Sequence, residues 1–194
     1  MIDFSVFRWL YAPQNFQVAN DRVSIRTEPK TDFWQRTYYG FQNDNAPAFL
    51  RSIAEDFTFT VKTTFDSNTQ FDQCGVIIYQ DSDNWFKASI EYENNQIARL
   101  GSVVTNLGHS DWATTDISAE VRMMWYRLSR RGPDFLIENS EDGEAFRQMR
   151  IFHLHQPLPQ VHFGVYACSP LASSFEAVFT DFRLTASTWQ AHPL

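Results

Sequence analysis

Glycine is scarce in this sequence, and no two glycines have the spacing that phosphate-binding loops require. The chain has 7 glycines among 194 residues and contains no Gly-x-Gly, no Gly-Lys-Ser/Thr and no Gly-x-Ser-x-Gly segment. Rossmann and P-loop sites need closely spaced glycines so that the backbone can approach a phosphate, and the nucleophile elbow needs them for its sharp turn. The sequence therefore excludes these site classes, together with collagen-like and glycine-rich linker chains.

Cysteine is equally rare. The two cysteines, Cys74 and Cys168, lie in apolar segments, and no Cys-x-x-Cys motif is present. Thiols stay reduced in the cytosol and behave there as small buried hydrophobes. We therefore predict two buried free thiols, and a disulfide only if the fold brings the two residues together.

Positive charge is in the minority, and long hydrophobic runs are absent. Lys and Arg number 16 against 23 Asp and Glu, for a formal net charge of -7. An acidic chain is a poor match for phosphate backbones and anionic membrane surfaces. Asp3 and Arg8 interrupt any signal-peptide core, and the apolar runs 76–79 and 123–126 are far shorter than a membrane helix of ~20 residues. We expect a cytoplasmic protein with no nucleic-acid and no membrane partner.

Aromatic residues are abundant by contrast, with 18 Phe, 7 Tyr and 6 Trp. The length suits a single domain over residues 1–194. Within 57–65, Phe57, Phe59, Val61 and Phe65 fall on one side of a strand, while the intervening positions are polar. The segment 161–167 alternates in the same way. Period-two alternation predicts strands with one buried face.

Further strand-like segments follow along most of the chain, and no amphipathic helix longer than about ten residues is evident. The predicted strands are 22–27, 57–65, 73–80, 85–93, 97–105, 121–130, 134–139, 145–152, 161–167 and 174–184. Asn20-Asp21, Asn94-Asn95 and Glu141-Asp142-Gly143 supply turn residues between such segments. We predict an all-β, two-sheet antiparallel jelly-roll sandwich, with a barrel as the alternative.

One predicted strand has an unusual polar face. In 84–93, Phe86, Ala88 and Ile90 would face the core, whereas Trp85, Lys87, Ser89, Glu91 and Glu93 would share the other side. An aromatic ring beside charged groups is a common sugar-binding arrangement, since the ring stacks on a pyranose and the charges bond its hydroxyls. The alternative is an ordinary solvated face with an incidental tryptophan.

Several other polar-aromatic positions are candidates for the same ligand site. They lie at predicted strand ends or in loops, where sites tend to be placed. The predicted ligand-binding residues are Trp34, Tyr79, Trp85, Lys87, Glu91, Asn106, Asp111, Trp112 and Arg127. We expect the rings of Trp85 and Trp112 to stack on the ligand. Lys87 and Arg127 would donate hydrogen bonds, and Glu91 would accept them.

Catalytic and metal chemistry have weaker signals. Glu91 and Glu93 would lie roughly 7 Å apart on a strand, near the carboxylate spacing of glycosidases, but any Glu-x-Glu strand gives that spacing. His153, His155 and His162 would need to converge to bind a metal, and no fourth ligand is indicated. We therefore predict neither a catalytic pair nor a metal, and no cofactor.

Several motifs in order resemble those of the regulator-of-enolase-like family, a group of concanavalin A-like domains of unknown function. The most specific are Asp72-Gln73-x-Gly75 and Ser110-Asp111-Trp112. The segments that match are 31–34, 71–78, 85–92, 102–106, 110–112, 125–128, 140–143 and 179–182, within a similarity that spans roughly residues 5–185.

This resemblance implies a jelly-roll sandwich related to lectins and glucanases, whose sugars lie across a concave sheet, and it implies no known reaction. The catalytic strand of laminarinase-type glucanases reads Glu-x-Asp-x-x-Glu, whereas the matching positions here are Glu91, Glu93 and Gln96. An amide cannot act as a general acid. Three hypotheses follow: a carbohydrate-binding domain, a glycoside hydrolase or lyase using Glu91 or Glu93, and a regulatory module that binds a protein partner.

Overall fold

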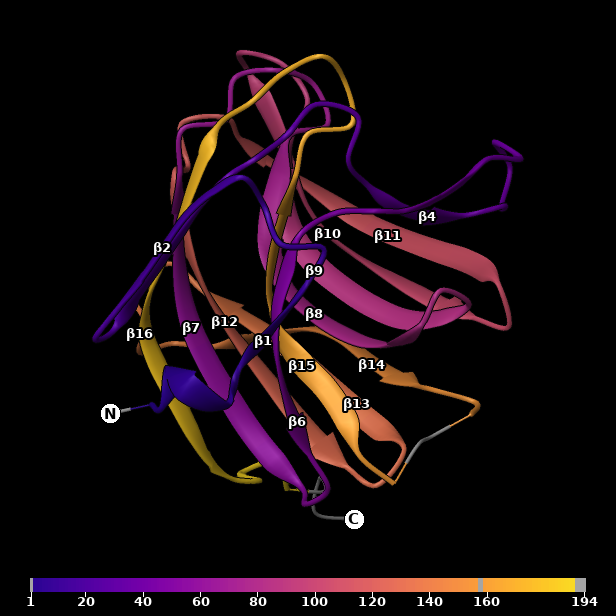
Figure 1. Cartoon of the computed structure of the whole chain (residues 1–194), viewed down its shortest axis with the longest axis vertical. Coiled ribbons are helices and arrows are strands. Elements are labelled where there is room, and N and C mark those ends of the chain that lie inside the picture. Colours follow the sequence, from indigo (N-terminus) through magenta and orange to yellow (C-terminus); the bar gives the residue numbers. More distant parts are fainter. Residues whose placement is uncertain (1, 157–158, 191–194) are drawn as a thin grey trace.

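The computed structural model describes residues 2–156 and 159–190, which are almost entirely strands and loops (Figure 1). The only helical element in these residues is a 3-10 turn, η1 (Phe4–Val6). The strands are β1 (Arg8–Leu10), β2 (Asn15–Ala19), β3 (Arg22–Arg26), β4 (Phe33–Gln35), β5 (Gln42–Asp44), β6 (Ala48–Ile53), β7 (Phe57–Phe65), β8 (Gln73–Asp81), β9 (Asn84–Tyr92), β10 (Ile97–Asn106), β11 (His109–Ser118), β12 (Met123–Arg131), β13 (Asp134–Ser140), β14 (Arg147–His153), β15 (Val161–Cys168) and β16 (Glu176–Ala186).

Two seven-stranded antiparallel sheets pack face to face. Sheet A has the order β1-β6-β15-β8-β9-β10-β11, and sheet B has the order β14-β13-β12-β7-β16-β3-β2. A separate hairpin, β4–β5, forms a third, two-stranded element. The predicted all-β sandwich is confirmed, and the barrel alternative is wrong because the strands form two separate sheets.

Phenylalanine fills the space between the sheets. The ring centroids of Phe57 on β7 and Phe163 on β15 lie 4.3 Å apart, and those of Phe86 on β9 and Phe152 on β14 lie 4.0 Å apart. The inward positions of β9 are Phe86, Ala88 and Ile90, as the alternation predicts. Burial of such rings supplies most of the stabilising free energy of a sandwich core.

The ten strands predicted from alternation are all present, with ends shifted by a few residues. Of the other strands, β2 was indicated only by the Asn20-Asp21 turn that follows it, and the short strands β1, β4, β5 and β6 and the edge strand β11 were not among those predicted. β11 is mostly exposed and reads His109-Ser110-Asp111-Trp112 at its start, so no apolar side marks it as a strand. Its partner β10 pairs with it over ten residues and determines its conformation instead.

The hairpin β4–β5 lies against the outer face of sheet A, away from the sandwich core. A second hydrophobic cluster forms beneath it and the chain that follows it. Its buried members are Phe33, Trp34, Ala46, Ala48, Leu50, Ile77, Trp85, Val103, Tyr166 and Cys168. Sheet A is therefore covered by apolar side chains on both sides over part of its area, as long β-sheets in layered folds often are.

Two of the few glycines occupy strand interiors where neighbouring backbones come very close. A Cβ atom added at Gly75 would clash with the carbonyl oxygen of Ala88, and one at Gly164 would clash with that of Phe49. Glycine inside a strand commonly marks such close approach. These positions therefore require glycine for space.

Both cysteines are buried and free, which confirms the predicted thiols. Cys74 points into the core between the sheets, whereas Cys168 belongs to the cluster on the outer face. Burial raises the pKa of each thiol, so both stay protonated. Over the described residues no helix is both long and apolar enough to span a membrane.

Candidate functional site

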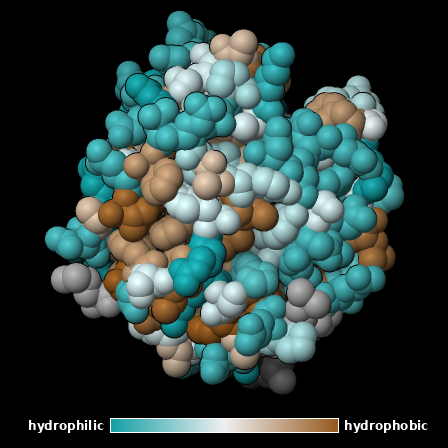
Figure 2. All heavy atoms as spheres, in the orientation of Figure 1, coloured by the Kyte–Doolittle hydropathy of each residue, from teal (hydrophilic) through white to brown (hydrophobic). Residues whose placement is uncertain are grey.

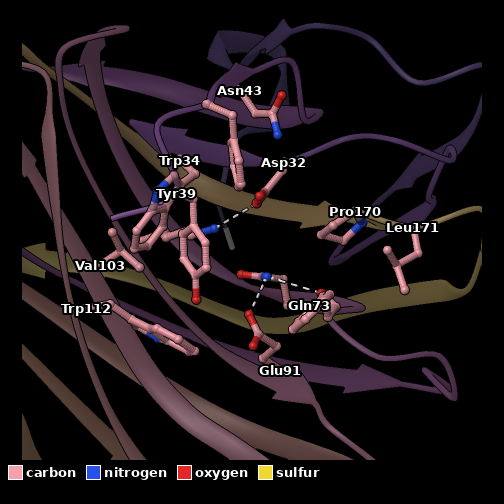
Figure 3. A pocket seen from close by; sticks show the side chains of 13 residues that line it. Asp32, Trp34, Tyr39, Asn43, Gln73, Glu91, Val103, Trp112, Pro170 and Leu171 are labelled. Carbon is pink, nitrogen blue, oxygen red and sulfur yellow. Dashed lines mark hydrogen bonds and ion pairs between the residues drawn. The ribbon is translucent and has the colours of Figure 1, made fainter. Parts of the chain in front are cut away.

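A cavity of about 340 Å³ opens on the outer face of sheet A (Figure 3). Strands β8 to β11 form its floor, the hairpin β4–β5 forms one wall, and the loop after β15 contributes to the rim. Its lining residues are Asp32, Trp34, Tyr39, Phe41, Asn43, Phe71, Gln73, Lys87, Glu91, Val103, Trp112, Pro170 and Leu171. This volume is near the lower end of the ~300–1,000 Å³ usual for small-molecule sites.

The floor is polar because of strand alternation. Lys87 and Glu91 occupy outward positions of β9, whose inward positions are in the core. Gln73 on β8 lies directly opposite Glu91 in the strand register. Trp112 on β11 lies opposite Val103 on β10. Strands β8, β9 and β11 thus bring an amide, an ammonium, a carboxyl and an indole to one surface.

An ion pair connects the wall to the floor. Lys87 Nζ lies 3.1 Å from Asp32 Oδ1, and the two side chains are only 5% and 14% exposed. Asp32 Oδ1 also accepts a hydrogen bond from the backbone N–H of Phe33. Burial by itself would lower the pKa of Lys87, but Asp32, Cys168 and Glu91 together outweigh burial and raise it. Lys87 therefore stays charged and holds the start of the hairpin on the sheet.

Only one of the two carboxyl oxygens of Glu91 has a hydrogen-bond partner among the described residues. Its Oε2 accepts a hydrogen bond of 2.7 Å from Gln73 Nε2, whereas its Oε1 is buried and has no hydrogen-bond partner among the described residues. Burial raises the pKa of Glu91 to about 7, although Lys87 opposes the shift. A large share of the molecules therefore carries a protonated Glu91 at neutral pH.

The amide of Gln73 is held in one orientation by its other contacts. Its Oε1 accepts a hydrogen bond of 3.0 Å from the Tyr166 hydroxyl, so its NH₂ group must point toward Glu91. The same NH₂ also donates to the carbonyl oxygen of Phe71 at 3.2 Å. One carboxyl oxygen of Glu91 is thus engaged by Gln73, and the other has no hydrogen-bond partner among the described residues.

Aromatic rings form much of the remaining surface. The centroids of Trp34 and Trp112 lie 6.3 Å apart in an edge-to-face arrangement, and Tyr39 lies 5.5 Å from Trp34. Trp34 is fixed by a hydrogen bond from its Nε1 to the carbonyl oxygen of Thr37. The guanidinium of Arg99 lies 5.7 Å from the ring centre of Trp112. Figure 3 shows Trp34, Tyr39 and Trp112 grouped on one side of the cavity.

The structure brings four of the predicted ligand-binding residues together: Trp34, Lys87, Glu91 and Trp112 all line the cavity. Trp85 does not, which corrects its predicted stacking role. Its ring is fully buried under the hairpin, and its Nε1 donates to the carbonyl oxygen of Ser82. Tyr79 belongs to the same cluster and donates its hydroxyl hydrogen to Asp44 at 2.8 Å.

Three further predicted residues lie elsewhere. Arg127 is on β12 in sheet B and makes a two-pronged ion pair with Glu138, so the predicted partnership of Lys87 and Arg127 in one groove does not form. Asn106 bonds the backbone of His153 and His155. Asp111 pairs with Arg150 on β14. None of the three lines the cavity.

Glu93 and the histidines are also outside the cavity. Glu93 accepts a hydrogen bond from Gln70 and pairs with Arg99 at 3.3 Å. His153 pairs with Asp134, and His162 bonds Ser52. His155 packs beside His153, but no group of three metal-ligating side chains occurs in residues 2–156 and 159–190. The three-histidine metal alternative is therefore not realised there.

Several lining residues were not predicted from the sequence. The most prominent are Tyr39, Phe41 and Asn43 on the hairpin, with Phe71, Val103, Pro170 and Leu171 at the edges. The signal that could have identified the hairpin is its aromatic segment Tyr38-Tyr39-Gly40-Phe41. This segment lacks the period-two alternation of a core strand, so its rings are not expected in the core between the sheets. Val103 has no distinguishing signal at all.

The fold and the cavity define a class of protein: a β-sandwich with a cavity on the outer face of one of its two sheets. A solved structure of a functionally unknown protein from Saccharomyces cerevisiae matches with a TM-score of 0.90 and 28% identity, over 97% of this chain and 100% of that one. The GH43 protein BlXynB of Bacillus licheniformis matches with a TM-score of 0.72 and 14% identity, over 93% of this chain but 37% of that one. This likeness shows a shared sandwich fold.

Residues 9–187 match the model of the family described as "Protein of unknown function (DUF1349)", and the chain belongs to that family. The curated relative "Regulation of enolase protein 1" of Saccharomyces cerevisiae is 31% identical over 186 residues, covering 94% of this chain and 91% of the relative. The resemblance noted in the sequence is thereby confirmed.

The buried ion pair gives a prediction about stability. Replacing Lys87 by Met leaves the Asp32 carboxylate buried without its counter-ion and should cost about 3–5 kcal/mol of unfolding free energy in denaturant titrations at pH 7. The double variant Lys87→Met with Asp32→Asn should recover part of that loss. Arg127→Met, which removes a more exposed pair, should cost about 1 kcal/mol. Equal losses for Lys87→Met and Arg127→Met would contradict this role.

Glu91 gives a prediction about pH. Its pKa is about 7 in the folded protein against 4.5 for an ordinary Glu, so the folded state binds more protons than the unfolded state between these values. This group should therefore lower stability as pH rises from about 4.5 to about 8, by about 2–3 kcal/mol, with little further change above. The unfolding free energy of wild type relative to Glu91→Gln should fall by that amount between pH 5 and 8. Parallel pH profiles for the two proteins would refute the shift.

Proposed function

We propose that this protein binds a carbohydrate or a sugar-like ligand in the cavity on the outer face of sheet A. The observation that carries the proposal is the combination of aromatic rings with an unsatisfied carboxyl oxygen in one cavity. Trp34, Tyr39 and Trp112 supply aromatic surface, and Glu91 supplies a buried oxygen that has no hydrogen-bond partner among the described residues.

Sugars suit this combination because they have both apolar and polar sides. The C–H face of a pyranose packs on an aromatic ring, while its hydroxyls both donate and accept hydrogen bonds. Here a hydroxyl would donate to Glu91 Oε1 and satisfy it. Asn43, also in the lining, offers an amide that can donate and accept. The likeness to the GH43 protein supports the proposal only by analogy of fold.

Net charge in the cavity also fits a neutral ligand. Asp32 and Lys87 neutralise each other at 3.1 Å, and Glu91 is protonated in a large share of molecules at neutral pH. A strongly charged ligand would meet little opposite charge that is not already paired. A polyhydroxylated neutral molecule requires none.

Trp112 provides the test of binding. Glycan-array screening followed by calorimetric titration should identify a saccharide, and Trp112→Ala should weaken its binding by about tenfold or more because a ring face is lost. Trp125→Phe is the matched control, because Trp125 lies on β12 in sheet B beneath Lys62. If Trp125→Phe weakened binding as much as Trp112→Ala, or if no saccharide bound either protein, the proposal would fail.

A second candidate function is glycoside hydrolysis or lyase chemistry with Glu91 as the acid. One observation favours it: the pKa of Glu91 is raised to about 7, which suits a group that donates a proton at neutral pH. The nearest other carboxylate in the lining, Asp32, is engaged by Lys87 and by the Phe33 N–H. Glu93, the other carboxylate considered from the sequence, lies outside the cavity.

An activity screen separates the two candidates. If the enzyme candidate is right, Glu91→Gln should abolish turnover of any glycoside or polysaccharide substrate that wild type cleaves, because an amide cannot transfer the proton. Glu93→Gln is the control and should retain near-wild-type activity. Turnover that survives Glu91→Gln would rule out this candidate while leaving ligand binding intact.

The proposal also covers the cellular compartment and the domain organisation. We place the protein in the cytoplasm, in keeping with two free buried thiols, and treat residues 1–194 as one domain. Binding of a protein partner stays a third hypothesis, suggested by the name of the yeast relative, "Regulation of enolase protein 1". It predicts a complex that saccharide does not dissociate.

A further inference from the structure

The turn that joins β4 to β5 exposes three aromatic side chains. Tyr38 is 92% exposed, Tyr39 53% and Phe41 45%. The turn stands out from the body of the molecule beside β11, and the space-filling view shows its tip as a separate projection at the upper right (Figure 2). Clustered exposed aromatics on a projecting turn commonly mark a binding surface.

The turn is held in this shape by specific contacts. Arg36 N–H donates to the Phe41 carbonyl oxygen at 2.9 Å, and Gly40 N–H donates to that of Arg36 at 2.8 Å. The Arg36 guanidinium bonds Asp83 Oδ1 and the Gly108 carbonyl oxygen, each at 2.8 Å, and so fastens the turn to sheet A. The exposed rings are therefore presented by an anchored element.

Its backbone is also strained at non-glycine positions. Arg36 has φ of 57° and Tyr38 has φ of 61°, both in the left-handed region. Such a residue costs about 1–3 kcal/mol unless surrounding contacts compensate, and this kind of strain gathers at binding sites. At Tyr38 the consequence is that a large ring faces solvent at a position where Gly or Asn would be easier to accommodate.

The aromatic surface is continuous from the cavity to this tip. Trp112, Trp34 and Tyr39 line the cavity, each within 6.3 Å of the next. Tyr38 lies outside the lining, with its ring 5.0 Å from Tyr39 and at 79° to it. Outside the lining, the ring that adjoins Tyr39 is that of Tyr38.

We propose that the ligand is an oligosaccharide, with one sugar unit in the cavity and a following unit packed against Tyr38 outside it. This inference rests on the proposed carbohydrate binding and adds the size of the ligand. A chain of repeated units is the occupant that uses a cavity and an adjoining outer ring at once. A monosaccharide would leave Tyr38 without a role.

Calorimetric titration with xylo-, cello- and manno-oligosaccharides of one to six units tests the proposal. In the series that binds, affinity should rise about three- to tenfold between one unit and two or three units and then level off. Tyr38→Asn should remove that gain and leave the affinity for the single unit unchanged. Asn suits the left-handed backbone, so this variant keeps the turn without the ring.

Two controls identify the ring as the cause. Tyr38→Trp should retain the gain, and Phe16→Ala, which removes an exposed ring from β2 in sheet B, should leave the whole series unaltered. Equal affinity for one unit and for six, with Tyr38→Asn indistinguishable from wild type, would overturn the oligosaccharide inference and leave carbohydrate binding standing. Binding of no member, together with no saccharide bound on the glycan array, would overturn both. Self-association that Tyr38→Asn abolishes, without saccharide binding, would assign the tip to a second copy of the chain.

Discussion

The buried ion pair between Lys87 and Asp32 is the interaction on which the site depends. A lysine at the centre of a sheet would normally extend into water, and here it is enclosed because a carboxylate from the start of β4 meets it at 3.1 Å. That contact fixes the hairpin on sheet A. The second hydrophobic cluster then forms under the hairpin, and the cavity is the part of the sheet face that remains uncovered.

The two faces of sheet A differ in composition and in what they contact. The inner face carries Phe86, Ala88 and Ile90 and packs on sheet B, where apolar area decides stability. The outer face combines buried polar groups with aromatic rings and leaves Glu91 Oε1 unsatisfied. A buried oxygen without a hydrogen-bond partner costs folding free energy, and this one belongs to a residue that lines the cavity.

Strand alternation predicted most of the fold because burial between two sheets imposes a period of two on each long strand. The same rule placed Lys87 and Glu91 on the outer face correctly. It also placed Trp85 on the outer face correctly, but it did not predict that the ring is buried there by residues far from it in the sequence, such as Phe33 at a centroid distance of 5.7 Å. Arg127 was expected beside Lys87 but lies on β12 in sheet B, because the pattern of one strand does not indicate the sheet to which that strand belongs. The hairpin residues Tyr39 and Phe41 had no periodic pattern that could reveal them.

By itself, the sequence determined the class of fold, the composition of the core and the kinship with a family, because these depend on local alternation and on ordered motifs. Its scarcity of glycine also excluded phosphate-loop chemistry. Only the tertiary structure decided which tryptophans are accessible, that Trp34 and Trp112 share a cavity, and that Glu91 Oε1 has no hydrogen-bond partner in residues 2–156 and 159–190. The reason is that accessibility and desolvation arise from contacts between distant segments, and no pattern within one strand encodes which segment will cover it.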